Sequence, residues 1–309
     1  MPTDTSLDKV DIRLLRVFMT VVECGGFTPA QVVLNVSQST ISSHMSALEA
    51  RLEMRLCERG RAGFRITPDG QRVFEASQRL YRSIETFTSD IEALRGRLTG
   101  DLHIGAVDNV VTNPDFALSD AISAFEKRHG EVRITLHIGT PAEIERSVVE
   151  GNYQIGVGAY TKQISGIEYT PLLKEKQALY CGSAHPLFQL PDDAIEEWDL
   201  AQYKFVKRPY VPDEHIPAAK VLKGAATAEN MEAIAILILS GGFTGFLPEH
   251  YAQRWIKTGE MKPILPDRMH YLSPMELIFR TTLPQTLAAQ FFKADLIEAF
   301  TARKLERAS

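Results

Sequence analysis

The chain has 309 residues, 44% of them hydrophobic and 24% charged, a composition typical of a globular protein with about two domains. No apolar run reaches the ~18 residues of a membrane helix, and the acidic start lacks the pattern of a secretory signal, so we expect a cytoplasmic protein. The net charge of −5 does not suggest a nucleic-acid binder, but residues 51–82 hold eight arginines against four acids.

Cysteine and histidine spacing predicts no metal site. Cys24, Cys57 and Cys181 are far apart, odd in number and without CxxC pairing, so we expect three reduced thiols. The alternative is a redox sensor at Cys181, which would need a low pKa and access. The histidines do not cluster, and GxSxG, HExxH, P-loop and GxGxxG motifs are missing. We therefore expect neither catalytic residues nor a cofactor.

Two helices are predicted at the start of the chain. Apolar residues recur at helical spacing from Asp11 to Cys24, and Gly25-Gly26 ends that pattern. Thr28 is the expected N-cap of a short second helix, because Pro29 suits the first helical position. Asn35 can take the left-handed conformation that ends this helix.

A third helix is predicted to begin after Ser37 as its N-cap, with one face buried and the other polar. Its buried stripe is Ile41, Met45, Leu48 and Leu52. Its polar face is Gln38, Ser39, Thr40, Ser43 and His44. Small polar side chains at a helix start, one tight turn after a short helix, suit base and phosphate contacts in a DNA major groove. The alternative is that the serines and threonine merely cap the helix.

A basic hairpin is predicted after this helix. Residues 59–65 contain Gly60 and Gly63, which permit a tight turn, and three arginines. This segment is a plausible wing for phosphate or minor-groove contact. The DNA-binding candidates are therefore Thr28, Pro29, Ser37, Gln38, Ser39, Thr40, Ser43, His44, Arg59 and Arg61.

Residues 9–70 closely resemble the LysR-type transcriptional regulators. The resemblance is carried, in order and at family spacing, by residues 15–18 (LRVF), 26–30 (GFTPA), 36–42 (VSQSTIS), 48–49 (LE), 56–59 (LCER) and 66–70 (ITPDG). It implies that the helix from Ser37 enters the major groove. Where family members commonly have proline and arginine, this chain has Ser39 and Ser43, which predicts an unusual half-site. Gln31 and Cys57 also depart from the common residues, as packing changes.

A long helix is predicted from Thr67-Pro68 to about Arg97. Its apolar residues alternate at spacings of three and four, as in a coiled-coil seam. The predicted dimerisation residues are Val73, Leu80, Ile84, Phe87, Ile91 and Leu94. A dimer would place two recognition helices on two half-sites, and the family resemblance adds that such regulators are often tetramers. The alternative is a helix packed on its own domain.

After Gly100 the pattern changes to alternating strands and helices, and the β-α-β-α-β order of its first set predicts a parallel sheet there. The first set is a strand at 102–106, a helix capped by Asn113-Pro114, a strand at 132–138, a helix with a capping box at Thr140 and a strand at 154–158. The second set is strands at 178–182 and 204–207, a helix capped by Thr227, a strand at 243–247, a helix from Pro248, a strand at 276–281 and a helix from Pro284.

The predicted fold class is α/β. An all-α winged helix-turn-helix (1–66) and a linker helix (67–97) precede a two-lobed effector domain (98–309). The resemblance implies that this domain is like the periplasmic binding proteins, with lobe one at 101–170 and 275–309 and lobe two at 171–274.

Such a fold holds ligand between its lobes, at the sheet switch points. The candidate effector-binding residues are Asp108, Asn109, Val110, Thr140, Pro141, Lys207, Arg208, Asn230 and Met231. Free N–H groups at helix starts favour a carboxylate effector. Asp108 argues the other way, because it would repel an anion or select an amine. Thr140 has the simpler alternative of capping its helix.

The function we expect is a DNA-binding transcription regulator controlled by a small-molecule effector of unknown identity. Its expected partners are double-stranded DNA, the effector, a second copy in a homodimer or homotetramer, and RNA polymerase, with no membrane. The alternatives are an effector-independent regulator, a solute-binding protein, a purely architectural nucleoid protein, and an enzyme with a DNA-binding appendage.

Overall fold

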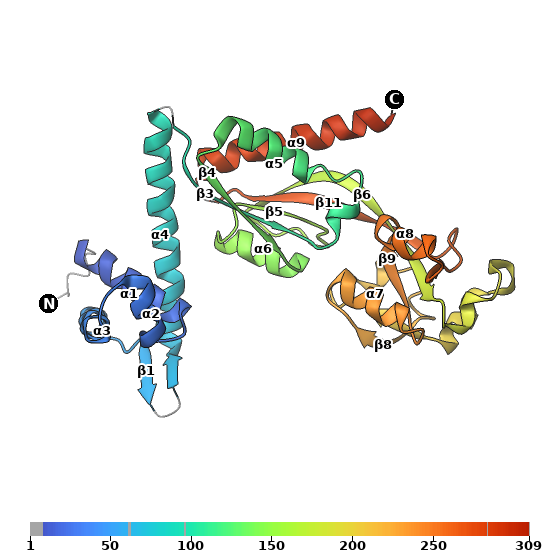
Figure 1. The fold of residues 1–309 in the computed structure, drawn as a ribbon, viewed down its shortest axis with the longest axis horizontal. Coiled ribbons are helices and arrows are strands. Elements are labelled where there is room, and N and C mark those ends of the chain that lie inside the picture. Colours follow the sequence, from blue (N-terminus) through green and yellow to red (C-terminus); the bar gives the residue numbers. More distant parts are fainter. Residues whose placement is uncertain (1–8, 61–62, 96, 283, 309) are drawn as a thin grey trace. The chain divides into compact units, whose positions relative to one another are not determined.

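The computed structural model of the chain describes residues 9–60, 63–95, 97–282 and 284–308. The chain divides into two compact units, one ending at Thr88 and the other beginning at Ser89 (Figure 1).

The described part of the first unit contains three helices and a hairpin, followed by most of a long fourth helix. The helices are α1 (Lys9–Glu23), α2 (Phe27–Leu34) and α3 (Gln38–Leu52), and strands β1 (Cys57–Gly60) and β2 (Gly63–Ile66) pair antiparallel. Their apolar sides form one core, which includes Leu14, Phe18, Val21, Phe27, Ala30, Ile41, Met45, Leu48 and Leu56. The predicted buried stripe of the third helix is confirmed at its first three positions, and Leu52 packs at the edge of this core.

Local backbone chemistry explains most of these helix ends. Asn35 takes the left-handed conformation, with φ 52°, and ends α2 as predicted. Ser37 caps α3, because its side chain accepts a hydrogen bond from the Thr40 N–H. The predicted cap at Thr28 is wrong. The N-cap of α2 is Gly26, whose φ of 153° is open to glycine, and the helix therefore starts at Phe27.

Helix α4 (Pro68–Leu94) follows the hairpin and is the long helix that the heptad pattern predicts. Thr67 caps it by accepting a hydrogen bond from the Gly70 N–H at 2.9 Å. Gly70 is required, because a Cβ there would collide with the Leu56 carbonyl oxygen. Val73 and Leu80 pack against the core of the first unit.

The second unit is built on one sheet, of nine strands in the described part of the chain. Its order is β4-β3-β5-β11-β6-β9-β7-β8, with β10 paired to β6. The strands are β3 (Gly100–Ala106), β4 (Val132–Ile138), β5 (Ile155–Gly158), β6 (Ile167–Gly182), β7 (Lys204–Lys207), β8 (Lys223–Thr227), β9 (Thr244–Pro248), β10 (Met261–Pro263) and β11 (His270–Arg280). Strands β3, β4 and β5 are parallel, and the long strands β6 and β11 run antiparallel to each other from one lobe into the other.

Helices cover this sheet in both lobes (Figure 1). They are α5 (Leu118–His129), α6 (Pro141–Glu150), α7 (Met231–Leu239), α8 (Glu249–Lys257) and α9 (Leu287–Ala308). Short 3-10 helices lie at Val110–Thr112, Pro186–Phe188, Asp192–Ala194, Glu197–Gln202 and Asp213–His215. One large core lies in lobe one, around Ile104, Phe125 and Phe292, and two lie in lobe two, around Ile238 and Leu179.

The predicted architecture of winged helix-turn-helix, long helix and two-lobed α/β part is confirmed, but several element limits are wrong. Helix α5 begins at Leu118 rather than after Pro114, and α9 begins at Leu287 rather than at Pro284. Asn230, not Thr227, caps α7, because Thr227 is held at the end of β8 by pairing with Lys207. Within the described residues, the helices are too short or too polar to span a membrane.

Candidate functional site

The start of α3 carries a cluster of hydroxyl groups at the protein surface. Ser37 Oγ, at the N-cap, lies 2.8 Å from Ser39 Oγ and 2.9 Å from Thr40 Oγ1, both in the first turn of the helix. The Gln38 N–H donates to Gln31 Oε1 at 3.1 Å, which ties α3 to α2. The capping interpretation of these residues therefore holds for Ser37. Their predicted contact with DNA stays a prediction.

Other candidates for DNA contact extend from this cluster. Thr28 and Pro29 are exposed in the first turn of α2, and Ser43 is exposed on α3. His44 is half-buried, and its Nδ1 atom is buried without a hydrogen-bond partner among the described residues. A polar atom in that state costs free energy, which a ligand or solvent contact would recover.

Glu49, at the C-terminal part of α3, holds the hairpin next to that helix. The sequence motifs include this residue, but its pattern alone predicts no role for it. Glu49 Oε1 accepts hydrogen bonds from the Leu56 and Cys57 N–H groups at 2.8 and 3.2 Å. Arg59 lies in β1 opposite Phe64, whose ring packs edge-on against Phe27. Arg61 lies outside the described residues.

In the second unit, a loop of lobe one contacts lobe two directly. Asp108 Oδ2 accepts a hydrogen bond from the Met231 N–H, at the start of α7, with 2.6 Å between the two atoms. Burial raises the pKa of Asp108, and this hydrogen bond opposes the rise. Asn109 follows with a left-handed φ of 58°, and Val110 is buried. Asp108 and Met231, both predicted effector contacts, therefore contact each other.

Thr140 forms the capping box that its sequence predicts. Its hydroxyl accepts from the Glu143 N–H at 3.3 Å, and Glu143 Oε2 accepts from the Thr140 N–H at 2.9 Å. The hydrogen bonds that the Glu143 carboxylate accepts, first from the Thr140 N–H and then from the Thr140 hydroxyl, lower the pKa of Glu143. Because Pro141 has no N–H, most donors at the start of α6 are already engaged.

The candidates of lobe two differ in their surroundings. Asn230 Oδ1 accepts from the Ala233 N–H at 2.8 Å as the cap of α7. Lys207 Nζ pairs with Asp213 Oδ1 at 2.7 Å. Arg208 is 7% exposed, and its Nη2 donates to Gln177 Oε1 at 2.6 Å and to the Phe246 carbonyl at 3.2 Å.

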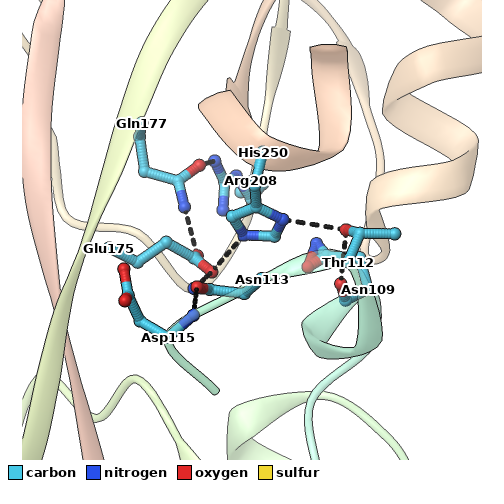
Figure 2. Close-up of polar contacts among 8 residues, drawn as sticks. All are labelled: Asn109, Thr112, Asn113, Asp115, Glu175, Gln177, Arg208 and His250. Atoms are coloured by element: carbon cyan, nitrogen blue, oxygen red, sulfur yellow. Dashed lines mark hydrogen bonds and ion pairs between the residues drawn. The ribbon is translucent and has the colours of Figure 1, made fainter. Parts of the chain in front are cut away.

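A buried polar network connects Arg208 to the crossing strand β6 (Figure 2). The Glu175 carboxylate accepts three hydrogen bonds, from Asn113 Nδ2 at 3.2 Å, Gln177 Nε2 at 2.7 Å and His250 Nε2 at 2.7 Å. Gln177 in turn accepts from Arg208. The acid and the guanidinium are thus joined through an amide rather than by a direct ion pair.

The same network links the two lobes a second time. His250, in the first turn of α8, lies with Nδ1 2.8 Å from the Thr112 hydroxyl oxygen in lobe one (Figure 2). Thr112 also donates to the Asn109 carbonyl at 3.0 Å. Loop 108–113 is therefore docked on the starts of both α7 and α8.

A cavity of about 260 Å³ lies beside this network. It is lined by Ala159, Tyr160 and Thr161 after β5, by Arg208, Tyr210, Val211 and His215 after β7, and by Tyr271, Leu272, Ser273 and Pro274 of β11. Of the predicted effector contacts, only Arg208 lines it. The remaining wall was missed because Tyr160 and Tyr271 lie outside the strands predicted at 154–158 and 276–281, and no motif marks them. The described residues contain no group of three His, Cys, Asp or Glu side chains placed to hold a metal ion.

Family comparison agrees with both parts of the chain. Residues 12–71 match the bacterial regulatory helix-turn-helix protein family, lysR type, and residues 95–301 match the LysR substrate binding domain.

Individual relatives span most of the chain. The HTH-type transcriptional activator BauR of Pseudomonas aeruginosa is 39% identical over 295 residues, 95% of this chain and 97% of that protein. The uncharacterised regulator YvbU of Bacillus subtilis is 28% identical over 79% of this chain and 86% of its own.

Solved structures show the same fold at lower identity. CbnR, a LysR family transcriptional regulator, has a TM-score of 0.67 and 22% identity, covering 93% of this chain and 98% of its own. Full-length CbnR complexed with its target DNA gives 0.66 and 22%, with 93% and 99% covered. With a helix-turn-helix domain and a substrate-binding domain on one chain, this protein belongs to the LysR family of DNA-binding transcription regulators.

Proposed function

We propose that this regulator binds DNA as a homodimer or homotetramer in the cytoplasm and is switched by a small molecule held between the lobes of its second unit. The observation that supports the switch is the docking of loop 108–113 of lobe one on the starts of α7 and α8 of lobe two. A ligand that binds one lobe arrangement better than another shifts the population toward it.

DNA contact is proposed for the polar face of α3 and for the hairpin. The support is the exposure of Gln38, Ser39 and Ser43 in the first two turns of the capped helix α3, which follows the short helix α2 and precedes a hairpin rich in arginine. Such helices enter the major groove, while basic hairpins add sequence-independent phosphate contacts.

The finer parts of the proposal concern partners. The exposed apolar side chains of α4 support dimerisation, with Phe87 66% and Leu94 84% exposed in the single chain. We propose RNA polymerase as the downstream partner and activation as the outcome, because the relative BauR is named a transcriptional activator. The function is ligand-controlled binding rather than catalysis.

Fluorescence anisotropy tests the proposal, with the full chain titrated against the DNA upstream of its own gene and against shuffled DNA at the same salt concentration. We expect binding to be tighter by ~10³-fold or more for the natural sequence. Equal, weak binding to both sequences would show that the DNA upstream of its own gene holds no specific site for this chain. A genome-wide selection of bound fragments that yields no shared half-site would contradict sequence-specific regulation itself.

A further inference from the structure

The inter-lobe cavity carries one cation on its wall and no acid. Among its lining residues the permanent charge is the guanidinium of Arg208, and neither Asp108 nor Glu175 lines it. Arg208 is 7% exposed, and the hydrogen bonds that fix it go to neutral oxygens of Gln177 and Phe246. Among the described residues, no carboxylate forms an ion pair with Arg208. Asp108 is near enough that the charge of Arg208 partly opposes the rise in the Asp108 pKa, but the two side chains form no direct ion pair. A buried guanidinium that is not directly paired with a carboxylate is costly, which makes it an anchor for an anion.

The two helix starts that were candidate sites for an anionic ligand already form hydrogen bonds within the protein. The start of α6 is satisfied by the Thr140–Glu143 capping box, and the start of α7 by Asp108 and Asn230. Asp108 occupies the start of α7, so that helix dipole is not free for an anion. Asp108 also does not line the cavity, so it is not a partner there for an amine.

The rest of the cavity wall belongs to both lobes and is mostly apolar or aromatic, with Thr161, His215 and Ser273 as further polar residues. Tyr160 comes from lobe one, Val211 from lobe two, and Tyr271 and Leu272 from the crossing strand β11. The Tyr160 hydroxyl is buried without a hydrogen-bond partner among the described residues. The volume of about 260 Å³ lies just below the ~300–1,000 Å³ of drug-sized ligand sites.

We propose that this cavity binds a small organic monocarboxylate, whose carboxylate pairs with Arg208 and whose short apolar or aromatic body packs between Tyr160 and Tyr271. This assignment rests on the proposed ligand-controlled function and names the ligand class for it. Because the ligand contacts residues of both lobes, its binding energy depends on their relative orientation, which is the property a switch needs.

The test compares ligands that match in shape and differ in charge. The full chain is titrated by calorimetry, at pH 7.5 and constant ionic strength, with benzoate and butyrate, with the neutral benzamide and butyramide, and with the cationic benzylamine and butylamine. At least one carboxylate should bind, and it should bind more tightly than its amide and amine.

Variants then locate the binding. Arg208→Gln should weaken carboxylate binding by about ten- to a hundredfold, as expected for a hydrogen bond to a charged group. Lys207→Gln is the matched control: it removes a neighbouring cation that already pairs with Asp213 and does not line the cavity, so binding should persist. Ala159→Leu fills the cavity with Arg208 intact and should abolish binding, which guards against a folding defect in the arginine variant.

The assignment is overturned if all six probes fail to bind, if an amine or amide binds more tightly than its carboxylate, or if Arg208→Gln binds as the wild type does. DNA binding is measured on the same preparations. A wild-type chain that binds a carboxylate through Arg208 but shows no specific DNA binding would contradict the proposed function and leave the ligand assignment standing.

Discussion

The Asp108 carboxylate and the Met231 backbone N–H form a hydrogen bond of 2.6 Å between lobes one and two. The carboxylate sits where the partial positive charge of α7 is concentrated, so the bond is favoured by the helix dipole. Its burial nevertheless raises the pKa of Asp108, which shows that desolvation outweighs the hydrogen bond. This contact therefore links the two lobes, and burying the Asp108 charge opposes part of its stabilising effect.

Asp108→Asn should make thermal stability less dependent on pH. Because the folded pKa lies above the ordinary value of 3.8, the folded state keeps a proton that the unfolded state has released. The Asp108 contribution to stability therefore falls as pH rises from about 3.8 through the folded pKa, and this loss persists above it. Asparagine at this position has no titrating carboxyl group, so this loss of stability disappears, and its side-chain oxygen can still accept the hydrogen bond from the Met231 N–H. The difference in Tm, variant minus wild type, should grow over this range and then level off, and a difference that shrinks would contradict the assignment.

Phe87→Asp combined with Leu94→Asp should give monomers. Both side chains are largely exposed on α4, whereas Leu80 packs against the core of its own unit, where a charge would damage folding instead. Light scattering should then report about the 34.5 kDa of one chain. Trp198→Asp, which charges an equally exposed apolar side chain outside α4, should leave the oligomer intact. An oligomer that survives the double substitution would show that α4 is not the dimer contact.

Substitutions on α3 and on the hairpin should affect DNA binding in different ways. Ser39→Ala and His44→Ala should change the order of preference among single-base-pair variants of the site, by about 1–3 kcal/mol at the affected positions. Arg61→Ala should weaken all sites similarly and lower the salt slope by about one. Anisotropy over a series of salt concentrations measures both quantities. A hairpin substitution that altered base preference alone would contradict this division of roles.

Cys181 should resist alkylation in the native chain. Burial raises the pKa of its thiol to about 12, so almost none of it is thiolate at pH 8. Cys24 is half-buried and should react first with iodoacetamide, whereas Cys57 and Cys181 should react only after unfolding in guanidinium. Mass spectrometry of labelled peptides gives the order. Fast labelling of Cys181 in the native chain would restore the redox-sensor alternative, which the buried thiol argues against.

Elements set by nearby residues could be predicted from sequence. The Ser37 and Thr140 caps are examples, because each hydroxyl bonds to an N–H three residues further along the chain. The periodicity of α4 likewise predicted one continuous helix. These interactions need no partner from elsewhere, so the local pattern contains all the information they use.

The predicted helix starts were wrong where two nearby residues could each serve as the N-cap. Thr227 and Asn230 are both good caps, and pairing of Thr227 with Lys207 extends β8 and leaves the cap to Asn230. At the start of α2, Gly26 rather than Thr28 is the N-cap, because the glycine takes a conformation that lets the helix begin two residues earlier, at Phe27. In each case a strand partner or a backbone conformation decided the limit.

The sequence by itself therefore determined the family, the order of elements and the capped starts of α3 and α6. The tertiary structure alone decided the interior of the cleft. His250 meets Glu175 across 75 residues of chain and Arg208 meets Gln177 across 31, because β6 crosses between the lobes and turns its polar side chains toward loops that follow other strands. These pairings between distant parts of the chain decide which charges in the cleft have partners. They therefore also decide that Arg208 is available to pair with a ligand.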